Sequence, residues 1–161
     1  MKRIGDTWIV FHLPLAWSDE DRAWTETTVR TVIHLGLSRG WETPLGLPLE
    51  IVPLNRPYGI LPGDVFQVQA LLEGKPVPGV KIYAEKFHKP PMKKPYPPDE
   101  IITRVAQTTP DGTALVTLHS SGWWILFAAY EQDEIQKDEK SGPVVLQDAV
   151  WIYVESSQER K

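Results

Sequence analysis

Apolar side chains recur at every second position along several short stretches of the chain. This period of two is typical of half-buried β-strands. It is clearest in DVFQVQALLEG (residues 64–74) and in VKIYAEKF (residues 80–87). Runs of β-branched and aromatic residues predict further strands at residues 7–13, 24–36, 49–54, 100–108, 113–119, 123–132 and 148–156. No stretch favours a helix longer than a turn or two.

Proline, glycine and charged residues mark the connections between these strands. Pro53 removes a backbone donor and therefore confines its strand to a sheet edge or to a place where the strand crosses between sheets. LPGD at residues 61–64 predicts a type II turn, and TPDG at residues 109–112 predicts a tight hairpin between its flanking strands. The proline-rich stretch HKPPMKKPYPP (residues 88–98) is expected to form an extended surface loop, and DEIQKDEKSG (residues 133–142) a charged loop.

From Leu49 onwards, about seven strands follow at a spacing of roughly ten residues, which is the pattern of a β-sandwich. We therefore expect an all-β, immunoglobulin-like sandwich over residues 43–156 and a frayed tail at residues 157–161. The two strands within residues 1–42 are left over, and two strands alone cannot bury a core. They are expected to extend a sheet of the sandwich, to pack over it, or to self-associate with another copy of the chain.

Composition adds several exclusions. The 161-residue chain has a formal net charge of −4 and scattered Lys and Arg residues, so it lacks the basic surface of a nucleic-acid-binding protein. It has no cysteine, which excludes disulfides, thiolate metal sites and a cysteine nucleophile. Its 15 Pro, 11 Gly and 7 Trp residues favour an all-β domain with many turns. No apolar run is long enough to span a membrane as a helix.

No set of residues has the spacing of a catalytic or cofactor site. The four histidines lie outside any metal-ligand motif, no serine sits in a nucleophile elbow, and the glycines lie at turns. We therefore predict that the chain is not an enzyme and binds no small-molecule cofactor. If a metal ion is bound, the candidate ligands are Glu85 and His88, which bracket the start of the proline-rich loop, together with His119.

The adjacent residues Trp123 and Trp124 face opposite sides of their expected strand. In one interpretation, one of them lies in the core and the other packs beneath a loop or a second domain. Apolar residues on both faces of the strand favour this interpretation. In the other, one of them binds a carbohydrate or a protein partner. Trp124 is the candidate for that role, and Arg56 and Tyr58 are further partner-binding candidates.

A family resemblance rests on three motifs: GLPLEIVPLNRPYG (residues 46–59), PGDVFQVQ (residues 62–69) and LEGKPVPGV (residues 72–80). ITRVAQTTPDGTALVTL, SGWWILFAA and DAVWIYV extend it toward the C-terminus. With these, the chain resembles the periplasmic component of nickel and cobalt uptake transporters of the energy-coupling type, the NikM/NikK type. The resemblance implies a sandwich similar to the carboxypeptidase-regulatory and transthyretin-like domains. It also implies a periplasmic or extracellular location, membrane-embedded transporter subunits as partners, and a nickel or cobalt ion as ligand.

The chain departs from that family at its start. Members begin with a signal peptide and an N-terminal β domain that carries potential metal ligands. This chain begins with MKRIGDTWIVF, where such a domain would be near its end. Residues 1–42 are then the remnant of that domain, and no ligand can be carried over from it. Two functions are therefore expected: a transporter accessory or metal-binding component, or a non-enzymatic interaction module without a metal site.

Overall fold

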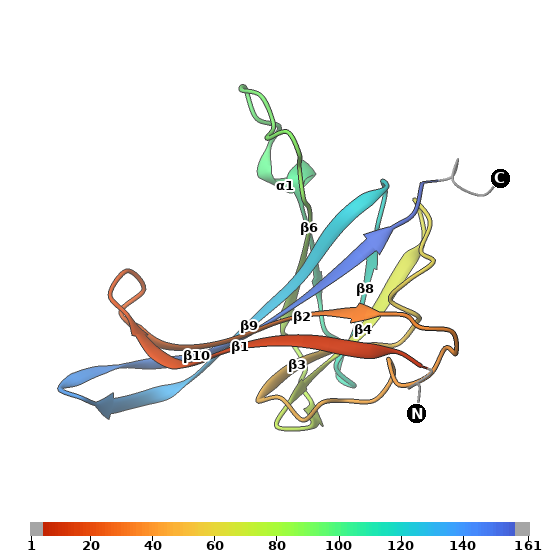
Figure 1. The fold of residues 1–161 in the computed structure, drawn as a ribbon. Coiled ribbons are helices and arrows are strands. Elements are labelled where there is room, and N and C mark those ends of the chain that lie inside the picture. The colour runs from red at the N-terminus through yellow and green to blue at the C-terminus, as the bar shows by residue number, and fades with distance from the viewer. Residues whose placement is uncertain (1–4, 157–161) are drawn as a thin grey trace.

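The computed structural model describes residues 5–156, which form two β-sheets and one short helix (Figure 1). The larger sheet has six strands in the order β1-β2-β10-β9-β6-β7. These strands are β1 (Thr7–Ser18), β2 (Ala23–Ile33), β6 (Lys81–Lys86), β7 (Thr103–Gln107), β9 (Gly122–Lys137) and β10 (Lys140–Val154). Neighbouring strands pair antiparallel, except that β2 and β10 run parallel.

The smaller sheet is built around one central strand, β4. Its strands are β3 (Leu49–Pro53), β4 (Val65–Leu72), β5 (Lys75–Pro76) and β8 (Thr113–Thr117). β3 pairs with one side of β4, and β5 and β8 pair with successive parts of the other side. The single-turn helix α1 (Asp99–Ile102) precedes β7. The fold is therefore an all-β, immunoglobulin-like sandwich with two extra N-terminal strands, as predicted.

The hydrophobic core lies between the two sheets, where the inward positions of the strands meet. On β4, Phe66, Val68 and Ala70 are fully buried, and on β6 so are Ile82 and Ala84, as the period of two predicts. The long strands β9 and β10 supply the rest of the core from the larger sheet: Trp124, Leu126, Ala128, Val150, Ile152 and Val154. Within residues 5–156, no helix is long and apolar enough to cross a membrane.

The connection from β3 to β4 follows the sequence prediction. β3, which ends at Pro53, pairs only with β4 among the described strands and is therefore an edge strand. At residues 61–64, the Asp64 N–H donates to the Leu61 carbonyl at 3.0 Å, and Gly63 has a φ of 95°. A positive φ at the third residue defines a type II turn, which favours glycine there.

The turn at residues 109–112 forms, but it does not close a hairpin. The Gly112 N–H donates to the Thr109 carbonyl at 2.8 Å, and Gly112 has a φ of 77°. β7 pairs with β6 in the larger sheet, whereas β8 pairs with β4 in the smaller sheet. The predicted hairpin is therefore wrong. The Asp-Gly sequence favours a reversal of the chain, but it does not determine which strands pair on either side of it.

The charged stretch at residues 133–142 is also not the expected loop. It forms the outer ends of β9 and β10, an arm that projects at the lower left of Figure 1. Residues 138–139 have φ angles of 50° and 62°, as in a type I′ hairpin turn. The β1–β2 turn lies beside this arm: Trp17 packs edge to face on Trp24 at 5.5 Å, and the Lys137 ammonium lies 5.3 Å from the Trp24 ring. Tertiary contacts thus override the local polar composition.

β1 and β2 extend the larger sheet, which is one of the three arrangements expected for them. β2 runs parallel to β10 along its residues Val144 to Trp151. One continuous sheet therefore contains strands from both of the segments expected from the sequence, residues 1–42 and residues 43–156. Residues 1–4 and the tail predicted at 157–161 lie outside the described residues.

Candidate functional site: an aromatic sheet face

The outer face of the larger sheet, turned away from the core, carries apolar side chains from neighbouring strands. Strand pairing places Phe11 of β1 opposite Val29 of β2, and Thr31 of β2 opposite Trp151 of β10. All four point outward, because side chains on a strand alternate between the two faces of a sheet. We call this surface the aromatic face and define it by residues that line its central hollow: Phe11, Val29, Thr31, Phe87, Trp123 and Trp151.

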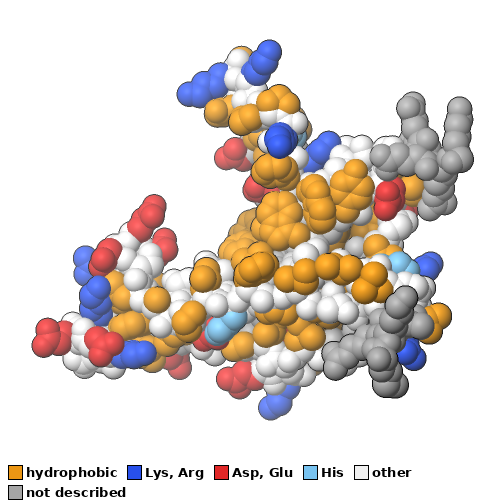
Figure 2. Space-filling model, in the orientation of Figure 1, with side chains coloured by type: hydrophobic (Ala, Val, Ile, Leu, Met, Phe, Trp, Pro, Cys, Tyr) orange, Lys and Arg blue, Asp and Glu red, His pale blue; other side chains and the backbone are white. Residues whose placement is uncertain are grey.

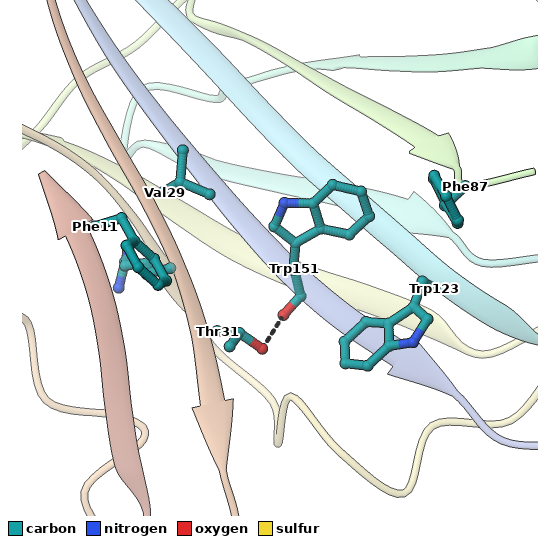
Figure 3. Close-up of a pocket in the computed structure, with 7 residues that line it drawn as sticks. Phe11, Val29, Thr31, Phe87, Trp123 and Trp151 are labelled. Atoms are coloured by element: carbon teal, nitrogen blue, oxygen red, sulfur yellow. Dashed lines mark hydrogen bonds between the residues drawn. The ribbon is translucent and has the colours of Figure 1, made fainter. Parts of the chain in front are cut away.

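The hollow has a volume of about 340 Å³. In the close-up, Trp151 lies between Phe11 on one side and Trp123 and Phe87 on the other (Figure 3). The Phe87 ring packs edge to face on Trp151 at 6.2 Å, and the Thr31 hydroxyl donates to the Trp151 carbonyl at 3.0 Å. The Phe87 ring thus packs on the central indole, and the hydrogen bond ties the Trp151 backbone to β2.

Large parts of these rings are open to solvent. Phe11 is 67% exposed, Phe87 52% and Trp123 45%. Figure 2 shows apolar side chains gathered across the middle of this view, while many of the charged side chains lie on the arm and the upper loop. A second hollow of similar size, lined by Tyr83, Glu85, Ile125 and Phe127, continues the same outer face across β9 and β6. The apolar surface therefore spans most of the sheet's width.

Arg30 also borders the hollow, but its guanidinium lies in the core. Its Nη2 donates to Asp148 Oδ2 at 2.8 Å and to the Ile51 carbonyl at 2.7 Å, and its Nη1 lies 3.4 Å from Glu50 Oε1. The indole ring of Trp8 lies 4.8 Å from the guanidinium carbon. Among the described residues, the aromatic hollow is thus lined without a charged group that points into it.

The two buried carboxylates, Glu50 and Asp148, each accept hydrogen bonds from backbone N–H groups. The Ile51 N–H donates to Asp148 at 2.7 Å, and the backbone N–H groups of Leu45 and Gly46 donate to Glu50 at 2.7 and 3.0 Å. Burial raises the pKa of Asp148, while the Arg30 guanidinium and the Ile51 N–H oppose that rise. This cluster joins β2 and β10 of the larger sheet to β3 of the smaller one. It anchors the strands that display the aromatic face.

The three candidate metal ligands lie in different settings. Glu85 points to the outer face of β6 and accepts a hydrogen bond from the Thr103 hydroxyl. His88 is exposed in the proline-rich loop. His119 stands edge-on to the Trp124 ring at 4.9 Å. Within residues 5–156, no three His, Asp or Glu side chains are grouped closely enough to hold a metal ion.

The structure reverses the expected roles of the two adjacent tryptophans. Trp124 is fully buried, and its Nε1 donates to the Ser120 carbonyl at 2.8 Å. The prediction that Trp124 contacts a partner is therefore wrong, because its whole side chain lies between the sheets. Trp123 is the exposed member of the pair, and its ring packs edge to face on Tyr153 at 5.3 Å.

The other partner-binding candidates, Arg56 and Tyr58, lie near the start of β1. Arg56 is exposed, whereas the Tyr58 hydroxyl donates to Asp6 Oδ2 at 3.0 Å and shares a 2.7 Å hydrogen bond with the Ser38 hydroxyl. His34 Nδ1 lies 2.6 Å from the other Asp6 oxygen, and its ring stacks on Tyr58 at 4.2 Å. Burial raises the pKa of Tyr58. Tyr58 therefore joins loops together rather than presenting a free hydroxyl.

The family model described as Domain of unknown function (DUF4198) matches residues 3–132. The chain belongs to this family. No curated protein and no solved structure matches it. The DUF4198 match includes β1 and β2 together with both strands that flank the proline-rich loop, so the extra N-terminal strands belong to the family pattern. Its description assigns no activity to the aromatic face.

Most residues of the aromatic face could not be predicted from the sequence. Phe11 and Val29 looked like ordinary strand residues, and Trp151 was one apolar position among others in the strand expected at residues 148–156. One signal was present: Ile9, Phe11 and Leu13 alternate with Trp8, Val10 and His12 in a run that is apolar on both faces. Such a run indicates either a strand buried on both faces or a strand with one apolar face exposed to solvent. Only the pairing of β2 with β10, which places β1 at the edge of the larger sheet, shows that the second alternative holds.

Proposed function

We propose that this DUF4198 chain is a non-enzymatic docking module whose aromatic face binds an apolar surface of a protein partner. The resemblance to the periplasmic component of nickel and cobalt uptake transporters suggests the partner. On this proposal the chain is an extracytoplasmic accessory component that docks on the membrane-embedded transporter subunits. The observation that carries the proposal is the exposure of Phe11, Phe87 and Trp123 around one uncharged hollow.

The physical reason is the cost of leaving such a surface in water. Folded proteins rarely keep large contiguous apolar patches exposed unless they bind something there. Tryptophan is among the residue types that contribute most to binding energy at protein interfaces, and central aromatic anchors are typical of such interfaces. A hollow of about 340 Å³ can receive one or two large apolar side chains of the partner.

The chemistry of the lining favours binding over catalysis. The side chains around the hollow offer no acid, base or metal ligand, and the one hydroxyl, that of Thr31, donates to the Trp151 carbonyl. A sugar site would need several polar groups beside its aromatic platform to satisfy the ligand hydroxyls. An apolar protein surface needs none, which is why a protein partner is proposed here.

The proposal can be tested by binding to transporter subunits. The full chain would be mixed with detergent-solubilised permease subunits of a nickel or cobalt uptake transporter, and affinity measured by biolayer interferometry. We expect the double variant Phe87→Ser and Trp123→Ser to bind about tenfold or more weakly. The matched control, Val65→Ser with Leu115→Ser, removes two similarly exposed apolar side chains of the smaller sheet and should bind as the unmodified chain does. Equal affinity of both double variants would contradict a role for the aromatic face.

A metal-binding function is the second candidate, and one observation favours it. Asp6 holds His34 through Nδ1, which is the usual arrangement for an imidazole that ligates a metal through Nε2. One histidine does not make a metal site, so further ligands would have to come from outside the described residues. Calorimetric titration with Ni²⁺ and Co²⁺ tests it: heat that is lost in the His34→Ala variant would support metal binding, and no heat would exclude it at the concentrations used.

A further inference from the structure

The outermost strand of the larger sheet, β1, has an open hydrogen-bonding edge. Among the described strands it pairs only with β2. The Gly5 N–H donates to the Leu35 carbonyl on the β2 side, and the Asp6 N–H donates to the Arg39 carbonyl. Because backbone groups alternate along a strand, the N–H and C=O groups of Trp8, Val10 and His12 turn away from β2, toward the open edge.

This open edge has defined ends. The loop that carries Arg39 covers it at Asp6, and Pro14, which has no N–H, interrupts it together with a register shift between Leu13 and Ala16. The segment in between is residues 7–13. Seven residues of strand are enough for a regular ladder with a second strand.

The edge also lacks the usual protection against pairing. Natural edge strands are normally protected by charged residues, by proline or by bulges. In β1 the proline and the register shift come only after residue 13. Residues 7–13 contain no Lys, Arg, Asp or Glu. Five of the seven side chains are apolar, and four of these are open to solvent: Ile9 is 37% exposed, Val10 40%, Phe11 67% and Leu13 60%. By contrast β7, the opposite edge of this sheet, is five residues long and carries Arg104.

We infer that the occupant of this edge is β1 of a second copy, paired antiparallel about a two-fold axis at Val10. In this register Val10 faces Val10 of the second copy, Ile9 faces its Phe11, and Trp8 faces its His12. Every facing pair is uncharged when the imidazole is neutral, so the strand is complementary to itself. The residues whose backbone groups point outward also face one another, as an antiparallel ladder requires.

The dimer has a consequence for the aromatic face. Antiparallel pairing within one sheet places the two-fold axis perpendicular to that sheet, so the same face of both copies lies on one side. Phe11 of each copy then borders the joint, and the two aromatic faces become one continuous surface. This inference goes beyond the proposed docking function and does not depend on it, because the pairing uses backbone groups of β1 alone.

Charge substitutions at the axis test the pairing and its register. The unmodified chain should sediment at twice its 18.3 kDa mass. Val10→Lys places two ammonium groups face to face across the axis, and Val10→Glu two carboxylates, so each variant alone should sediment as a monomer. An equimolar mixture of the two variants should recover the dimer, because Lys then faces Glu.

Two controls keep the test decisive. Val105→Lys puts the same charge on the opposite edge strand at a similarly exposed position and should leave the dimer intact. Circular dichroism of each variant checks that the sandwich is folded. Recovery of the dimer in the mixture would show that neither substitution at Val10 destroys the strand. A monomeric unmodified chain, a dimer that persists in Val10→Lys, or a mixture that stays monomeric would each overturn the inference. Loss of transporter binding in the Trp123 variant would bear on the docking proposal alone.

Discussion

Arg30 is a residue whose role depends on partners far away in the chain. It reaches Asp148, which lies 118 positions along the sequence, and Glu50 on the other sheet. Two buried carboxyl groups share one guanidinium, so some of their oxygens take hydrogen bonds from the backbone instead, as Asp148 does from the Ile51 N–H. Buried polar and charged groups are tolerable only when such partners are in place.

This arrangement predicts a large effect for removing one partner. Asp148→Ala leaves the Arg30 guanidinium buried with a weaker set of acceptors and should lower the free energy of unfolding by about 3–5 kcal/mol. Urea denaturation followed by tryptophan fluorescence measures this. The matched control Glu131→Ala removes an exposed carboxylate on the same sheet and should change stability by less than about 0.5 kcal/mol. Equal stability of the two variants would show that the buried cluster is energetically neutral.

His119 gives a prediction on protonation. Burial lowers its pKa below the ordinary value of 6.5, and the positive charges of Arg104 and Lys86 lower it further. The unfolded chain therefore binds the proton more readily than the folded one, so this histidine's contribution to stability is complete above pH 6.5 and is lost as the pH falls below it. An NMR titration should place its midpoint below 6.5. Arg104→Gln should raise the midpoint, whereas Arg22→Gln, on the distant β1–β2 turn, should not.

At the scale of elements, the arm of β9 and β10 depends on the β1–β2 turn that lies beside it. Gly142 marks the closest approach: a Cβ there would lie 2.6 Å from the Arg22 carbonyl oxygen and 2.9 Å from the Trp17 ring. Gly142→Ala should therefore push the turn off the arm and lower the free energy of unfolding by about 1–3 kcal/mol. Ser141→Ala, one residue away and exposed, is the control. Thermal unfolding that is unchanged in Gly142→Ala would mean that the two hairpins move apart freely.

The strands differ in how well their sequences predict them. β4 and β6 were located to within one or two residues, because each alternates with a period of two and carries its own buried set. The arm could not be found in this way, since its residues are polar on both faces and its strand character comes from pairing. The Asp-Gly turn failed for a related reason. Turn chemistry is local, whereas the assignment of β7 and β8 to different sheets depends on contacts with β6 and β4.

At the scale of the whole molecule, the sandwich class followed from strand spacing, but the aromatic face did not. Its residues come from β1, β2, β9, β10 and the segment after β6, and only the parallel pairing of β2 with β10 brings them together. A single sequence carries no signal for that register. Trp123 and Trp124 are an example: alternation placed the two indoles on opposite faces of the strand, and only the sheet shows that Trp124 is buried and Trp123 exposed.

The parallel pairing of β2 with β10 also predicts how strongly the amides of the N-terminal strands are protected from hydrogen exchange. If β1 and β2 were a separate unit that only leans on the sandwich, their amides would exchange with solvent far faster than those of the core strands. Because β2 lies between β1 and β10 and contributes the buried residues Trp24, Thr28 and Arg30, its amides should instead be protected nearly as well as those of β10.

Native-state hydrogen exchange read by mass spectrometry measures both strands at once. The proline-rich loop at residues 88–98 serves as the internal reference for fast exchange. Exchange of β2 at the rate of that loop would mean that the N-terminal strands detach as a unit, and the larger sheet would then be four strands with a movable pair.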